Sequence, residues 1–108
     1  MNTKQIAELI RSADPAAKHY NATSSAKAGI DFTVWMEYER TGLEADDVWI
    51  ELGWLFEVDR YTKTEFDPVA ESLEKSFLAD ERITLRDYRV LYDVDTGYIR
   101  HVFDCEAI

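Results

Sequence analysis

The sequence predicts a single α+β domain in which an antiparallel sheet of about four to five strands carries two helices on one face. Two segments have apolar residues at the 3.6-residue spacing of a helix, and four segments alternate apolar and polar residues as strands do. Every clear strand pairing joins neighbours through a turn, which favours α+β over α/β. The chain has 108 residues, of which 46% are apolar, so residues 1–108 are expected to form one domain with its own core. The expected order is α-(β)-β-β-α-β-β.

The first element is expected to be a helix. Its apolar stripe runs through Ile6–Ala13, and it ends at Asp14-Pro15 because the residue before a proline avoids helical angles. Residues 16–29 are small and polar, apart from a histidine and a tyrosine. They predict a loop, with a short edge strand around Lys18–Thr23.

A long antiparallel hairpin is the strongest signal in the chain. The alternation of period two begins near Ile30, pauses at a Thr41-Gly42 turn and resumes over Val48–Val58. We expect the helices to cover the face that carries Phe32, Val34, Met36, Tyr38, Ile50, Leu52, Trp54 and Phe56. Three large side chains then point away from the helices, namely Trp35, Trp49 and Leu55.

The C-terminal half predicts a second helix and a second hairpin. Asp67 is expected to cap a helix that begins at Pro68, a residue that suits the first helical position. Leu73 and Phe77 lie on its apolar stripe, and we expect Trp54 and Phe56 to pack against them. The strands of the closing hairpin are expected at Leu85–Tyr92 and Tyr98–Ala107, joined by the turn residues Asp93–Gly97.

The charge of the chain restricts its partners. The formal net charge of −10 repels nucleic acid and anionic membranes, so we expect no direct binding to either. Residues 1–30 carry a net charge of +2, and residues 31–59 carry −8. Copies of the chain can therefore meet head to tail, or the acidic part can bind a basic partner; in the alternative, the acidic residues only favour solubility.

No residue pattern predicts catalysis, a cofactor or a bound metal, so we expect a protein that is not an enzyme. His19 and His101 lie far apart and outside any metal-ligand spacing. Cys105 lies between two acidic residues, which disfavour a reactive thiolate. Asp93 and Asp95 resemble a fragment of a calcium loop, but turn chemistry accounts for them. A single cysteine and an N-terminus without an apolar run lead us to expect a cytosolic protein.

The long hairpin is expected to carry the interface. Trp35, Trp49 and Leu55 on one sheet face indicate a contact surface, unless residues 16–29 or the last strand cover them. The tip of the hairpin is longer than a hairpin requires, and loops of this kind often make contacts; in the alternative it is only solvated. Its candidate contact residues are Leu43, Glu44, Asp46 and Asp47.

From about Asp46 onward, the chain resembles the tail terminator proteins of long-tailed bacteriophages, the minor tail protein U type. Asp47-Val48-Trp49-Ile50-Glu51-Leu52 is similar to the central strand of that family. Asp87-Tyr88-Arg89 and Asp93-Val94-Asp95-Thr96-Gly97 are similar to its final hairpin. The acidic hairpin, the amphipathic helix and the closing hairpin also follow each other in the same order.

The resemblance implies a structural protein that forms a ring, commonly a hexamer, on the last ring of the tail tube. Its expected partners are other copies of itself, the tail tube protein and a head-completion protein. Its expected location is the virion tail, after assembly in the host cytoplasm. The alternative, from a different class, is an acidic binding inhibitor of the immunity or anti-nuclease type, whose −8 segment blocks a basic active site.

Overall fold

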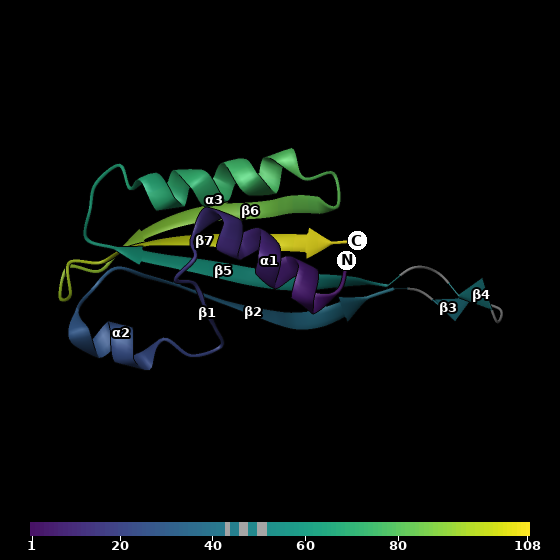
Figure 1. Cartoon of the computed structure of the whole chain (residues 1–108), viewed down its shortest axis with the longest axis horizontal. Coiled ribbons are helices and arrows are strands. Elements are labelled where there is room, and N and C mark those ends of the chain that lie inside the picture. Colours follow the sequence, from purple (N-terminus) through teal and green to yellow (C-terminus); the bar gives the residue numbers. More distant parts are fainter. Residues whose placement is uncertain (43, 46–47, 50–51) are drawn as a thin grey trace.

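Five strands form one sheet, and two helices pack on one of its faces (Figure 1). The computed structural model describes residues 1–42, 44–45, 48–49 and 52–108. Across the sheet the strands are β1 (Lys18–His19), β2 (Phe32–Thr41), β5 (Gly53–Thr62), β7 (Ile99–Ala107) and β6 (Ile83–Tyr92). The helices are α1 (Thr3–Ala13), α2 (Thr23–Ala28) and α3 (Pro68–Ala79), and a separate strand pair consists of β3 (Glu44–Ala45) and β4 (Val48–Trp49).

The predicted α+β class is confirmed. All neighbouring strands of the sheet run antiparallel except β1, which runs parallel to β2. Side chains of α1 and α3 share one buried cluster with side chains of the sheet, so both helices cover the same face. In the part of the chain that the structure describes, no helix is long and apolar enough to cross a membrane.

The core lies between this sheet face and the two helices. The ring of Phe77 on α3 meets Phe56 edge-on, with 6.1 Å between centroids, and meets Phe103 at 5.5 Å. All three rings are fully buried, as is Leu73. The predicted packing of Phe56 against Leu73 and Phe77 is thus confirmed.

Trp54 lies at the margin of the core. It is half-buried and packs against the core cluster, and the guanidinium carbon of Arg40 lies 4.4 Å from the centroid of its ring. Because part of the indole faces solvent, Trp54 contributes less buried area than the prediction of a core residue implies.

The predicted orientation of β2 is wrong. Trp35 faces the helices and is only 3% exposed, whereas Phe32, Val34 and Met36 lie on the opposite face. On β5 the prediction is correct, because Phe56 and Val58 face the helices. Alternation assigns side chains to two faces but does not say which face is covered, and the side chains of β2 are bulky on both.

The local signals of α1 and α3 locate both helices. Asn2 and Gln5 form a capping box at the start of α1, and the carboxylate of Asp67 accepts hydrogen bonds from Val69 N and Ala70 N at the start of α3. These bonds satisfy amide groups that a helix leaves free in its first turn.

The prediction of a loop over residues 16–29 is partly wrong. The predicted edge strand exists as β1, but it has only two residues, which pair with Val34 and Trp35. The segment also contains α2, which ends at Gly29 with a φ of 68°. This helix has no buried residue, so its sequence carries no apolar stripe by which it could be predicted.

Both hairpins pair as predicted, with small changes at their ends. The closing hairpin consists of β6 and β7, and its turn uses Gly97 at a φ of 78°. The long hairpin pairs β2 with β5 and has a bulge at Tyr38. Its second strand, predicted as one run over Val48–Val58, is divided into β4 and β5.

The different burial of Phe56 and Trp54 leads to a first prediction. Phe56→Ala should lower the free energy of unfolding by about 3–5 kcal/mol, because it opens a cavity beneath α3. Trp54→Ala should lower it by clearly less. Chemical denaturation of both variants measures the two values, and equal losses would contradict the placement of Trp54 at the margin.

Candidate interaction surface

The predicted interface residues fall into two groups. Trp35 and Leu55 are buried, at 3% and 8% exposure, so neither offers a contact surface in the isolated chain. Trp35 belongs to the buried cluster on the helix side of the sheet and is stacked on His19, with 4.0 Å between ring centroids. Leu55 lies on the face away from the helices, as predicted. Its side chain is nevertheless covered by neighbouring side chains, which the alternating sequence pattern does not indicate.

The remaining predicted interface residues belong to the tip of the long hairpin. Leu43, Asp46 and Asp47 lie outside the described residues, and only the backbone is described for Glu44 and Trp49. Their backbones belong to β3 and β4, which pair antiparallel with Glu44 opposite Trp49. Their use as contacts remains a prediction.

The sheet face opposite α1 and α3, here called the open face, carries paired charges. Arg100 on β7 donates to the carboxylate of Asp59 on β5 at 2.7 Å. The hydroxyl of Tyr38 donates to Asp104 on β7 at 2.7 Å and so spans β5 above Leu55 and Glu57. Burial, with help from this hydrogen bond, raises the pKa of Tyr38 to about 12.

An aromatic cluster occupies one end of the open face. Phe32 stacks on Tyr61 at 4.6 Å between centroids, and Tyr98 meets both rings edge-on at 5.8 Å. The Lys63 ammonium lies 4.9 Å from the centroid of Tyr98, and the Tyr98 hydroxyl donates to the carbonyl of Ile30 at 2.7 Å. These contacts fix the rings in place, with Phe32 and Tyr98 buried and Tyr61 half-buried.

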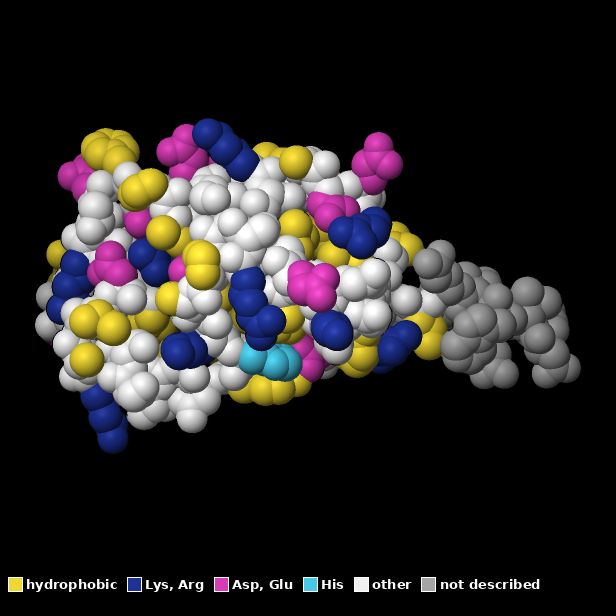
Figure 2. Space-filling view, viewed as in Figure 1, with side chains coloured by type: hydrophobic (Ala, Val, Ile, Leu, Met, Phe, Trp, Pro, Cys, Tyr) yellow, Lys and Arg dark blue, Asp and Glu magenta, His cyan; other side chains and the backbone are white. Residues whose placement is uncertain are grey.

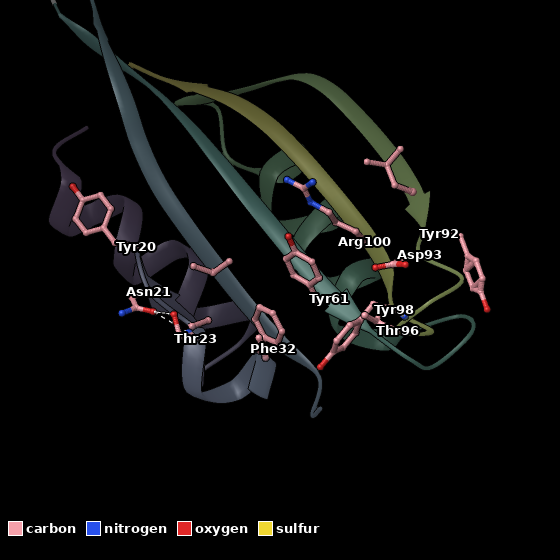
Figure 3. Close-up of a pocket in the computed structure, with 14 residues that line it drawn as sticks. Tyr20, Asn21, Thr23, Phe32, Tyr61, Tyr92, Asp93, Thr96, Tyr98 and Arg100 are labelled. Carbon is pink, nitrogen blue, oxygen red and sulfur yellow. Dashed lines mark hydrogen bonds between the residues drawn. The ribbon is translucent and has the colours of Figure 1, made fainter. Parts of the chain in front are cut away.

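A cavity of about 610 Å³ adjoins this cluster (Figure 3). Tyr20 and Asn21, just before α2, line one side, and Tyr92 and Asp93 at the β6–β7 turn line the other. Arg100 is also part of its wall, and among the described residues its Nε–H has no hydrogen-bond partner. Such a cavity can take an apolar group from a partner together with an acceptor for the guanidinium.

Sequence reasoning missed this aromatic cluster. Phe32 on β2, Tyr61 on β5 and Tyr98 just before β7 are far apart in the sequence, and only the pairing of β2, β5 and β7 brings them together. The one available signal was that Tyr61 follows Leu55, Glu57 and Asp59 at every second position of β5, on the face that points away from the helices.

One edge of the sheet is closed only in part, by His19 and Tyr20. The His19 Nε2 lies 2.7 Å from a carboxylate oxygen of Glu37, and the Tyr20 hydroxyl bonds the other oxygen. Burial opposes ionisation of Glu37, but these hydrogen bonds lower its pKa below the usual value. The contact anchors β1 at the start of β2 and leaves the later part of β2 without an outer neighbour among the described elements.

A buried charge cluster joins three elements on the helix side of the sheet. Arg60 donates through Nε to Asp67 at 2.8 Å, and it lies 3.6 Å from Asp14 and 3.8 Å from Asp31. Hydrogen bonds from the Thr62 hydroxyl and the Lys63 amide, with the charge of Arg60, lower the pKa of Asp31 although burial opposes its ionisation. The cluster ties the end of α1 and the start of α3 to β5.

This cluster makes Arg60 unavailable for contact with the acidic segment of a neighbouring copy. Arg60 is only 7% exposed and is paired within its own chain. Asp31, Glu37 and Asp59 of the −8 segment also have partners inside the chain. Figure 2 shows other Lys and Arg side chains spread over the face that carries α1, where Lys4 and Arg11 are exposed.

Two of the side chains weighed for chemistry, His101 and Cys105, lie on β7. The His101 Nδ1 lies 2.7 Å from the Tyr88 hydroxyl on β6, and burial lowers the pKa of the imidazole. Cys105 is fully buried, and burial raises the pKa of its thiol to about 12. Over residues 1–42 and 52–108, His, Cys, Asp and Glu side chains form no group of three that could hold a metal ion.

The burial of Cys105 can be measured directly. In the native protein we expect a disulfide reagent to label Cys105 at least about 100-fold more slowly than in denaturant, since a buried thiol with a raised pKa supplies almost no accessible thiolate. Rapid labelling of the native protein at pH 8 would show that β7 is exposed.

No family model matches the chain, and no curated protein matches it.

Proposed function

We propose that this protein is a structural protein that assembles into a ring and caps the tail tube of a long-tailed bacteriophage. The observation that carries the proposal is the long hairpin, whose β3–β4 end lies beyond the five-stranded sheet (Figure 1). The last strand, β7, ends opposite Trp54, so among the described residues the sheet offers β3 and β4 no further strand. The chain accordingly measures 52 Å along one axis and 25 and 23 Å along the others.

A projecting strand pair of this kind suits contact with another protein. A two-stranded ribbon is marginally stable by itself, and a partner that packs against it supplies the missing burial. In a ring, each copy would present one such arm on the same side, which fits docking onto the repeated subunits of a tube. The order α1, β2, β5, α3, β6, β7 also supports the resemblance to tail terminators.

The tail tube itself provides the functional test. The tube protein from the same genome would be polymerised with and without this chain, and tube lengths would be measured by electron microscopy. We expect shorter tubes with a ring at one end. Tubes of unchanged length and without rings, at an equal ratio of the two proteins, would contradict the proposal.

Salt dependence tests the electrostatic part of assembly. We expect the acidic segment of one copy to approach exposed basic residues of its neighbour, such as Lys4, Arg11 and Lys18. Self-association measured by sedimentation should weaken between about 0.1 and 1 M salt, because the screening length falls from about 10 Å to 3 Å. Each exposed pair contributes only about 0–1 kcal/mol, but a ring repeats it at every contact. Equal or tighter association at high salt would indicate an apolar interface instead.

A further inference from the structure

We propose that copies of this chain join edge to edge, with β6 of one copy pairing antiparallel to the later part of β2 of the next copy. The inference rests on the proposed function, since it names the contact that would close the ring. Its partner is a second copy of this chain, and both surfaces belong to the described residues.

The later part of β2 and the whole of β6 each offer a free edge among the described strands. The two residues of β1 cover β2 only at Val34 and Trp35, so from Met36 to Thr41 the only strand paired with β2 among the described elements is β5. At the other edge, the ten residues of β6 pair only with β7 within the described sheet. Unpaired N–H and C=O groups along such an edge readily bond another strand.

The strand directions favour a ring over a dimer. Since β2, β5, β7 and β6 alternate in direction, β6 runs opposite to β2. Copies related by rotation about an axis parallel to the strands therefore bring β6 against the next β2 in the antiparallel sense. A contact between two different surfaces closes into a ring when the rotation allows it, whereas a two-fold axis would join β6 to β6.

Charge and burial select one register. Arg89 and Leu91 lie on the open face of β6, opposite Val102 and Arg100 of β7, and both are exposed. Met36 and Glu39 lie on the open face of β2 and are also exposed. When Arg89 is placed opposite Glu39, the bulge at Tyr38 brings Leu91 opposite Met36. This register makes one ion pair and one apolar pair, and it continues both faces of the sheet across the contact.

The surrounding charges agree with this pairing. The exposed part of β6 carries Arg86 and Arg89 next to Asp87, which lies 3.0 Å from Arg89, while the free part of β2 carries exposed Glu39 next to Arg40. Each edge also has one bulge, between Glu37 and Glu39 on β2 and between Leu85 and Asp87 on β6. Bulges discourage indiscriminate strand pairing and so favour one specific register.

Disulfide trapping tests the register. In the double variant Met36→Cys/Leu91→Cys, each copy supplies one thiol to each neighbour. The two Cβ atoms of each pair would lie about 4.5–5.5 Å apart, as in any directly opposite cross-strand pair, which is close enough for a disulfide. Oxidation should give a ladder of covalent oligomers that ends at the closed ring. The matched control is Met36→Cys/Thr84→Cys, whose second cysteine lies on the same face of β6 but seven residues away; it should give no ladder. Buried Cys105 remains in both variants.

A charge swap gives an independent readout. Arg89→Glu and Glu39→Arg should each weaken self-association by about tenfold or more, and the double variant should recover to within about threefold of the parent protein. A double variant as weak as the weaker single variant would overturn the pairing. A covalent dimer of Leu91→Cys alone would also overturn it, in favour of β6–β6 contact.

The outcomes separate this inference from the proposed function. If the parent protein forms a ring but Met36→Cys/Leu91→Cys gives no ladder, the edge pairing is wrong and the proposed function stands. If the parent protein remains a monomer and does not shorten tubes, both are wrong.

Discussion

Replacing Arg60 with methionine is expected to destabilise the protein strongly at neutral pH. The substitution keeps the aliphatic length of the side chain but leaves Asp14, Asp31 and Asp67 around a site without a cation. Removing one partner from a buried ion pair costs about 3–5 kcal/mol, because the remaining charge stays uncompensated. A domain has only about 5–15 kcal/mol of stability in total, so the variant should melt far below the parent protein or fail to fold.

The pH dependence of this variant distinguishes lost charge from lost packing. In the parent protein the pKa of Asp31 is lowered, so its contribution is present above the ordinary pKa and is lost as the pH falls through the lowered one. In Arg60→Met, protonation removes charge that nothing compensates, so the folded state binds protons more readily than the unfolded state.

The variant should therefore become more stable as the pH falls from 7 to 5, as measured by thermal melting. The matched control is Lys75→Met, which removes a cation whose partner Glu71 is exposed; it should melt within a few degrees of the parent protein. An Arg60→Met variant whose melting temperature is independent of pH would show that only packing was lost.

Removing the hairpin arm is expected to abolish capping without unfolding the domain. Residues 42–52 would be replaced by an Asn-Gly turn, which can close the Thr41–Gly53 pair at the end of β2 and β5. The sheet and its core lie outside the replaced segment, so the melting temperature should change little. Edge pairing between copies should also persist, because Met36–Thr41 and β6 are retained.

Tube polymerisation measures the loss. With the shortened protein, tubes should be as long as tubes grown without any cap. Its oligomer should contain the same number of copies as that of the parent protein. A control that replaces Asp95-Thr96 with Asn-Ser in the β6–β7 turn, at the other end of the sheet, should cap normally. Normal capping by the armless protein would show that the arm does not dock onto the tube.

Elements with strong local signals were predictable from the sequence. The apolar stripe and the capping residues locate α1 and α3, and the alternation with turn residues locates both hairpins, although β5 continues to Thr62, beyond the predicted end at Val58. Their order and antiparallel pairing define the α+β class. These signals depend on neighbours in the chain, so no long-range contact is needed to read them.

Features that depend on distant contacts were not predictable. Asp14, Asp31 and Asp67 lie far apart in the sequence, and only the fold gathers them around Arg60. The orientation of β2 depends on which face α1 and α3 cover. Both faces of β2 carry large apolar side chains, so the sequence alone does not assign Trp35 to one of them. The same limit applied to the predicted interface, since the burial of Trp35 and Leu55 arises from tertiary packing.

The molar mass of the native protein tests the central claim, assembly into a ring, most directly. Native mass spectrometry and light scattering would be run from micromolar to about 1 mM, a concentration at which even a contact of −4 kcal/mol is half occupied. The proposed function predicts one closed oligomer with three or more copies of the 12.5 kDa chain and no larger series beyond it. A monomer or a two-fold dimer over the whole range would contradict it, and a monomer would favour the acidic inhibitor.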